Sequence, residues 1–253
     1  MGDWRAADGR SVIIALDHGL LGVPVGLENI RARVTEIVAA GPDALIVTPG
    51  LAKAVSQWEL PQQPALFITC DYRASATWPE GKPLGEAYRA IATPADARRL
   101  GAIGVKVMMM FGRENLATHA DNVAFVARCA RECEQVGLTM MIEPVLWGTQ
   151  VPAERQHEAA LVRHAVRLAV ELGADVIKSP YTGDASSIGE ICQHTPIPIV
   201  TLGGPKRATE DEVILEVVAA VGSGAAGVAL GRNVFQSNHH AAFIHRLRQA
   251  VHG

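Results

Sequence analysis

The sequence predicts an α/β protein of the (β/α)8 TIM-barrel type, built as a single domain over residues 1–253. Two observations favour this fold. Short apolar runs alternate with amphipathic helical stretches along the whole chain, and eight such pairs fit a chain of 253 residues. No linker, low-complexity tract or internal repeat divides the chain. A doubly wound open sheet is the alternative, but it usually has fewer strands and a glycine-rich turn after the first one, where this chain reads Leu16-Asp17-His18-Gly19.

The expected strands are nearly continuous apolar runs, which is typical of parallel strands buried on both faces. They are Val12–Ala15, Ala44–Val47, Ala65–Thr69, Gly104–Met109, Leu138–Ile142, Asp175–Lys178, Ile197–Thr201 and Gly227–Leu230.

The segments between these strands have the spacing of helices with one apolar face. The clearest cases are residues 30–37, 161–172 and 243–251. Helix start signals agree with this pattern, because Thr93 precedes Pro94 and because Thr209 with Glu212 has the spacing of a capping box.

The connection after the third strand, residues 70–92, is unusually long and carries Tyr72, Trp78 and Tyr88. Long loops at this end of a barrel serve as lids or binding loops, or as contacts between subunits. The sequence leaves both interpretations open.

Composition narrows the class of partner. A net charge of −3 gives no basic face for nucleic acid or an anionic membrane, and no uninterrupted apolar run is long enough to span a bilayer. The polar N-terminus lacks the features of a signal peptide or a myristoylation site, so we expect a cytoplasmic protein with a small-molecule partner. Cys129 and Cys133 could share a helix face as a metal pair, but no nearby cluster completes a site, which favours two core residues.

Barrel chemistry takes place where the strands run out into the following loops. Polar and glycine residues stand at these positions, on otherwise apolar strands. In chain order they are Asp17, Pro49, Cys70-Asp71, Lys106, Glu143, Lys178, Gly203-Gly204 and Gly231-Arg232.

Two lysines are the main candidates for nucleophilic chemistry. Burying a charged ammonium inside a barrel is costly, which favours the neutral amine at Lys178, and a neutral amine can form a Schiff base with a carbonyl. Lys106 would point inward from the fourth strand, whereas Lys178 closes the sixth, and its charge would disfavour a second charge at Lys178. The alternative for either lysine is a structural role, in a salt bridge to Asp17 or Glu143 or with its amine reaching solvent.

Asp17 and Glu143 can supply the proton transfers that cleavage of a carbon–carbon bond through an imine requires. His18, next to Asp17, is expected to point elsewhere and to be structural. The glycine turns at Gly203-Gly204 and Gly231 fall on the two connections where barrels commonly bind phosphate, and Arg232 adds a cation suited to it.

The stretch Lys178-Ser-Pro-Tyr-Thr-Gly-Asp184, the Gly203-Gly204-Pro205-Lys206 turn, the segment Gly231-Arg-Asn-Val-Phe-Gln236 and the opening Ala15-Leu-Asp-His-Gly19 occur in this order along the chain. In these motifs the chain resembles the DeoC/FbaB/LacD class I aldolase family, and the archaeal-type fructose-bisphosphate aldolases within it. The resemblance implies that Lys178 is the Schiff-base lysine, that Asp17 is an acid/base group, and that the backbone around the glycine turns and Arg232 holds a phosphate.

One segment departs from this family pattern. Archaeal-type members carry a Tyr-Pro-Arg-Gly segment after the fifth strand, whose tyrosine donates a proton, whereas this chain has Trp147 at about that position. Indole cannot act as a general acid. The segments around Lys106 and Glu143 resemble the tagatose-bisphosphate and sulfofructose-phosphate aldolases, in which a lysine and a glutamate assist the Schiff-base lysine. We therefore assign proton transfer to Glu143 and expect Trp147 to form a wall of the pocket.

The sequence thus predicts a lyase, a class I aldolase that cleaves a phosphorylated ketose through an imine, with dihydroxyacetone phosphate as donor. A transaldolase-like or thiolase-like enzyme acting on a phosphorylated dicarbonyl is the alternative, and a non-catalytic phosphate-binding barrel is a third possibility. The imine serves as electron sink, so no metal and no cofactor are expected. By analogy with related barrels, we expect a homo-oligomer.

Overall fold

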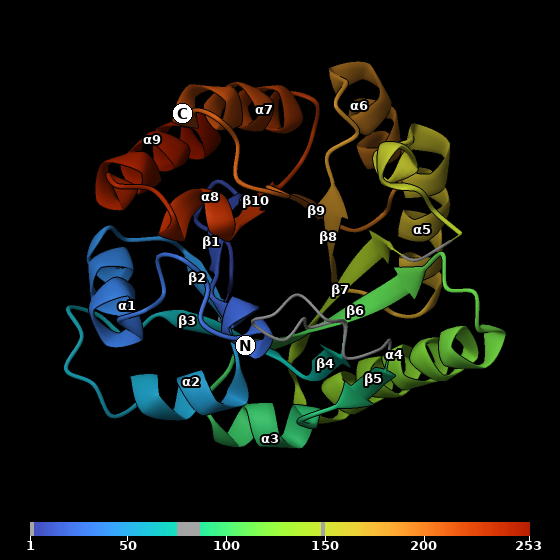
Figure 1. The fold of residues 1–253 in the computed structure, drawn as a ribbon, viewed down its shortest axis with the longest axis horizontal. Helices are drawn as coiled ribbons and strands as arrows, with labels where there is room; N and C mark the ends of the chain where they lie inside the picture. Colours follow the sequence, from blue (N-terminus) through green and yellow to red (C-terminus); the bar gives the residue numbers. More distant parts are fainter. Residues whose placement is uncertain (1–2, 75–86, 148–149) are drawn as a thin grey trace.

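The computed structural model describes residues 3–74, 87–147 and 150–253. Its centre is a closed barrel of eight parallel strands surrounded by helices (Figure 1). The barrel strands are β1 (Ser11–Ala15), β2 (Ala44–Val47), β3 (Ala65–Thr69), β6 (Gly104–Phe111), β7 (Thr139–Leu146), β8 (Val176–Pro180), β9 (Ile199–Leu202) and β10 (Gly227–Leu230). The predicted fold and each predicted barrel strand are confirmed.

Helices follow the strands in the order that a barrel requires. They are α1 (Ile30–Ala39), α2 (Pro49–Val55), α3 (Pro94–Arg99), α4 (Leu116–Val136), α5 (Ala159–Glu171), α6 (Ala185–Gln193), α7 (Glu210–Gly222), α8 (Arg232–Phe235) and α9 (His240–His252). Two 3-10 helices, η1 (Asp17–Leu21) and η2 (Ala153–Arg155), occupy the first and fifth loops. Within the described residues, no helix is long and apolar enough to cross a membrane.

Two of these helices begin at the predicted caps. Thr93 and Asp96 form a reciprocal capping box before α3. At α7, the Thr209 side chain accepts a hydrogen bond from the Glu212 amide.

The barrel closes where β1 pairs with both β2 and β10. At this seam Gly227 has φ +132°, and a Cβ there would lie 2.0 Å from the Ser11 carbonyl oxygen. The backbones can therefore approach this closely only because residue 227 is a glycine.

The inside of the barrel is apolar toward the amino-terminal ends of its strands. One buried cluster joins inward side chains of the strands to Trp4, whose ring meets that of Phe67 edge-on at 6.4 Å. Just before β2, the Asp43 carboxylate accepts a hydrogen bond from the Val12 amide and pairs with Arg248 and His252 of α9. These contacts tie the C-terminal helix to the closed end of the barrel.

The long third connection contains an antiparallel hairpin, which the sequence did not predict. Its strands are β4 (Asp71–Ala74) and β5 (Ala87–Ala90), and Tyr88 packs edge-on against Phe125 of α4. Trp78, expected to contribute to this loop, lies outside the described residues.

Candidate active site

A cavity of about 220 Å³ opens where the barrel strands end. Residues from β1, β3, β6, β7, β8, β9 and β10 and from the loops that follow them line it. All nine site residues predicted from the sequence are among them: Asp17, Lys106, Glu143, Trp147, Lys178, Gly203, Gly204, Gly231 and Arg232. Pro49 and Cys70, also noted at strand ends, are not in this lining.

The alternation of strand side chains explains why the charged groups converge. Met141 and Val176 belong to the apolar cluster inside the barrel, and Glu143 and Lys178 stand two residues further along the same strands. Because strand side chains repeat with a period of two, both point inward, one layer above the apolar one. Glu143 and Lys178 therefore lie within β7 and β8, and not at the strand ends as the sequence suggested.

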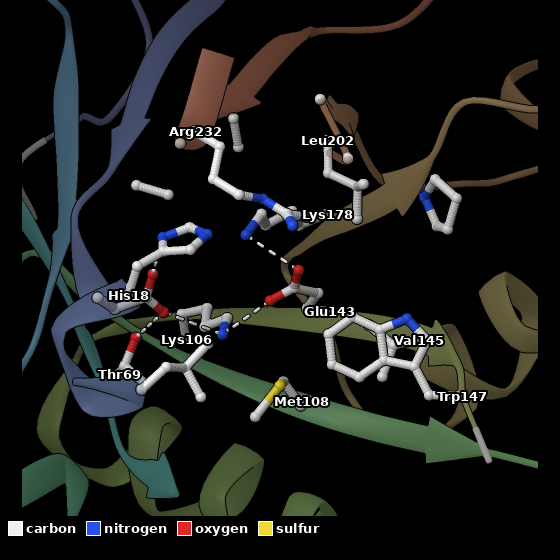
Figure 2. Close-up of a pocket in the computed structure, with 18 of the residues that line it drawn as sticks. His18, Thr69, Lys106, Met108, Glu143, Val145, Trp147, Lys178, Leu202 and Arg232 are labelled. Atoms are coloured by element: carbon white, nitrogen blue, oxygen red, sulfur yellow. Dashed lines mark hydrogen bonds and ion pairs between the residues drawn. The ribbon is translucent and has the colours of Figure 1, made fainter. Parts of the chain in front are cut away.

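A continuous chain of ion pairs crosses the cavity floor (Figure 2). Glu143 bridges the two lysines, with Oε1 at 3.0 Å from Lys178 Nζ and Oε2 at 2.7 Å from Lys106 Nζ. Lys106 Nζ also lies 3.2 Å from Asp17 Oδ2, which accepts a 2.8 Å hydrogen bond from the Thr69 hydroxyl. The salt bridges considered as an alternative to a catalytic role are thus present, and they connect both lysines to each other.

Burial and the two lysines shift the pKa values of the carboxylates in opposite directions. Burial raises the pKa of Asp17, but the ammonium groups of Lys106 and Lys178 outweigh it and hold that pKa well below its ordinary value. The pKa of Glu143 is lowered by the same balance, with Asp17 opposing. Burial lowers the pKa of Lys106, while Asp17 and Glu143 more than compensate and raise it. Lys106 is therefore an ammonium while both carboxylates are ionised, and it holds Glu143 in place through their 2.7 Å ion pair.

His18 lines the same cavity, so the expectation that it points elsewhere is wrong. Asp17–Leu21 form a 3-10 turn and not an extended strand end, which brings neighbouring side chains to one side. The His18 ring meets Phe235 edge-on at 5.1 Å, and a Cβ on Gly231 would lie 2.4 Å from His18 Cε1. Burial and the nearby Lys178 and Arg232 charges lower its pKa although Asp17 opposes them, so the ring is neutral at physiological pH.

Next to the His18 ring, Arg232 extends toward Lys178 (Figure 2). Its Nε is buried and has no hydrogen-bond partner in the structure, and burial lowers its pKa without removing its charge. A cation with an unused donor beside the glycine turns is suited to an anion.

Asn233 joins the two glycine turns, a role for which the sequence analysis had not singled it out, although it lies within the motif that begins at Gly231. Its Nδ2 donates to the carbonyls of Gly203 (3.0 Å) and Pro205 (3.1 Å), and its Oδ1 accepts from the Arg207 amide at 2.8 Å. The loops after β9 and β10 are therefore held as one surface.

Trp147 follows the end of β7 and lines the cavity together with Val145 and Met108, below Glu143 in the view of Figure 2. The wall is apolar here, as expected from the sequence. Since Trp147 stands at about the position of the proton-donating tyrosine, the predicted proton donor is Glu143, which lines the same cavity.

Known proteins match this chain over most of its length, including the residues of the cavity. The family model for DeoC/LacD aldolases matches residues 11–237. An uncharacterised aldolase from Saccharolobus solfataricus is 32% identical, over 96% of this chain and 90% of its own length. The 2-amino-3,7-dideoxy-D-threo-hept-6-ulosonate synthase of Halobacterium salinarum is also 32% identical, over 98% of this chain and 88% of its own. A solved archaeal fructose-1,6-bisphosphate aldolase, with its catalytic lysine bound to a carbinolamine intermediate, superposes with a TM-score of 0.84 at 25% identity, covering 98% of this chain and 96% of that one.

Proposed function

Because the chain belongs to the DeoC/LacD family of aldolases, it is a lyase, and we propose that it makes and breaks a carbon–carbon bond of a phosphorylated ketose through an imine on Lys178. The observation that carries this proposal is the pairing of the buried Lys178 amine with Glu143, whose other oxygen is fixed by Lys106. A nucleophile and a proton carrier thus lie in contact within one cavity.

Imine formation needs a neutral amine and the transfer of two protons. Lys178 passes one proton to Glu143, 3.0 Å away, and the neutral amine attacks the ketone carbon. Glu143 delivers that proton to the carbonyl oxygen, which becomes a hydroxyl, and takes a second proton from the nitrogen of the adduct. Glu143 returns a proton as that hydroxyl leaves as water, and the iminium remains. Because the pKa of Asp17 lies well below its ordinary value, we assign this carboxylate the stabilisation of the cations, and we assign to Glu143 the proton transfers that the sequence analysis divided between the two.

Cleavage then uses the iminium as the electron sink. Glu143 takes the proton of the hydroxyl on the carbon beyond the scissile bond, that hydroxyl becomes the aldehyde, and the bond electrons move to the iminium to give an enamine. Protonation of the enamine carbon and hydrolysis of the imine release the donor ketone. A tyrosine at the position of Trp147 is not needed for any of these steps.

The wall containing Arg232 is the proposed phosphate site. The unpartnered, buried Arg232 Nε and the backbone at Gly203, Gly204 and Gly231 support this assignment. One phosphate at this wall places the adjoining carbonyl toward Lys178, which fits dihydroxyacetone phosphate as donor.

A phosphorylated dicarbonyl is the second candidate substrate. It is favoured by the Halobacterium salinarum relative, which is named as a synthase of an amino-dideoxy-heptulosonate, and by Trp147 in place of the tyrosine. The same lysine and the same phosphate site would serve this reaction.

Borohydride trapping tests the proposal. The protein is incubated with dihydroxyacetone phosphate, or with a phosphorylated dicarbonyl, reduced, and examined by intact-mass and peptide mass spectrometry. An adduct on Lys178 is expected, and the ketone that gives it identifies the donor. An adduct on Lys106 would show that the wrong lysine was chosen, and no adduct with any phosphorylated carbonyl would overturn the imine mechanism.

A further inference from the structure

Asp71 is a third carboxylate at the cavity that the mechanism above does not use. It stands where the chain leaves the barrel for the β4–β5 hairpin. The Cys70 amide still bonds to the Lys106 carbonyl, but the Cys70 carbonyl is taken by the Ile91 amide. The Met108 amide of β6 therefore bonds to Asp71 Oδ2, a side-chain oxygen in place of a backbone acceptor. Tyr88 donates a second hydrogen bond to the same oxygen, at 2.9 Å.

The other oxygen of this carboxyl, Oδ1, is buried and has no hydrogen-bond partner among the residues that the structure describes. Asp71 is fully buried yet lines the cavity beside Lys106. A purely structural role is met by one oxygen, which an Asn amide would supply equally well. An unpaired buried carboxylate oxygen is costly, so the charge itself calls for an explanation.

The proposed reaction gives a reason for the charge on Asp71, because protonation of Glu143 removes a negative charge from the cavity floor. When Glu143 carries the substrate proton, the ion-pair chain described above keeps one ionised carboxylate, Asp17, together with the Lys106 ammonium and the Lys178 iminium. Asp71 adds a second negative charge, so that two carboxylates again face the two cations. Its field acts on Lys106, where it favours the ammonium form.

We propose that Asp71 is a positioning residue, a fixed carboxylate that stabilises the Lys106 ammonium while Glu143 is protonated. This role rests on the imine mechanism proposed above. Asp71 touches no reacting atom and acts only through Lys106.

The groups around Asp71 are consistent with a charge that can be lost. The titratable groups that interact with it are Tyr88 from β5, Lys106 from β6, Glu143 from β7, Cys70 after β3 and Cys129 from α4. Burial, aided by Glu143, raises the pKa of Asp71 to about 6, against the lowering effect of Lys106. The carboxylate is therefore ionised above neutrality and loses its charge below it.

Hydrogen exchange in the donor half-reaction tests the role without an acceptor. The hydrogen on the carbon next to the imine of dihydroxyacetone phosphate is replaced by deuterium in D2O as Glu143 removes it, which NMR follows. The exchange rate is measured from about pH 5 to about pH 8 in the wild type, in Asp71→Asn and in Tyr88→Phe. Tyr88→Phe removes a hydrogen bond from the same oxygen but keeps the charge.

We expect the ratio of the wild-type to the Asp71→Asn rate to rise from about one at the acid end to about tenfold at the basic end. Tyr88→Phe is expected to keep this advantage over Asp71→Asn. A ratio that does not change with pH would overturn the proposal and leave Asp71 with its structural role alone.

A second measurement separates this proposal from the imine mechanism. If the wild type gives no adduct on Lys178, the mechanism fails, and the field of Asp71 is then followed at the Lys106 Cε chemical shift in protein without substrate. A titration step near pH 6 in the wild type that is missing in Asp71→Asn would support the effect on Lys106. The same step in both proteins would refute it.

Discussion

Replacing Asp71 by Asn should change how the stability of the protein depends on pH. The amide oxygen can keep the hydrogen bonds from Met108 and Tyr88, so the main loss is the ionisable proton. The carboxyl has a pKa of 3.8 in its ordinary state and about 6 in the folded protein. The folded state therefore binds this proton more tightly than the unfolded state.

The sign and size of the effect follow from that difference. The stabilisation from Asp71 is complete below about pH 4 and is lost as the pH rises through about 6, and the loss amounts to about 3 kcal/mol. Asn does not titrate. The free energy of unfolding of Asp71→Asn, relative to that of the wild type, should thus be about 3 kcal/mol larger near pH 7.5 than near pH 4, so that the variant gains relative stability as the pH rises.

Urea unfolding followed by circular dichroism, at a series of pH values, measures this gap. Asp17 and Glu143 have lowered pKa values, so their stabilisation is lost at the acid end of the range. The part of the gap that develops as the pH rises through about 6 therefore reports Asp71. A gap that stays constant from pH 4 to pH 7.5 would refute the reasoning, because it would mean that Asp71 ionises alike in the folded and unfolded chains.

The other predictions concern the mechanism and the barrel seam. Lys178→Ala should abolish both the borohydride adduct and turnover, at least a thousandfold, whereas the exposed Lys53→Ala should leave both unchanged; substantial turnover in Lys178→Ala would contradict the imine. Arg232→Ala should raise KM for a phosphorylated ketose by more than about tenfold and leave that of its dephosphorylated form unaffected, because a charged hydrogen bond is lost only with the former; equal effects on the two would disprove the phosphate site. Gly227→Ala should lower the free energy of unfolding by about 4 kcal/mol or more, since its Cβ would lie 2.0 Å from a backbone oxygen, whereas Gly101→Ala, with a positive φ and nothing within 4 Å, should cost about 1 kcal/mol; similar urea midpoints for the two would argue against the seam clash. EDTA should leave activity intact, and a loss restored by zinc would exclude an imine as the sole electron sink.

The barrel and its charged floor could be predicted because both depend on short-range pattern. Parallel strands buried on two faces give apolar runs that stand out, and a lysine inside such a run, as in Lys178, indicates an unusual environment. The period of two then decides that Lys178 and Glu143 face inward, even though β7 extends to Leu146, further than the apolar run suggests. Pairing with the long strand β6 supports that extension, and such pairing is not visible in the sequence of β7 alone.

Other features depended on contacts between distant segments. The hairpin strands have four residues each and carry an arginine in place of a continuous apolar run, and their pairing is apparent only once the chain has folded back. His18 was misjudged because η1 replaces an extended strand end, and Asp71 was noted at a strand end but given no role because its partners, Met108 and Tyr88, lie far along the chain.

The hairpin begins and ends at one residue of the barrel, since the carbonyl of Cys70 receives the amide of Ile91. Whatever the chain does between these two points, the route from β3 into α3 stays the same. The cost of closing such an excursion grows only slowly with its length. The segment between Tyr72 and Tyr88 can therefore be exchanged for a shorter or longer one, by evolution or by design, while Tyr72 at the cavity, the Tyr88 hydrogen bond to Asp71 and the strand register that aligns the two lysines are kept.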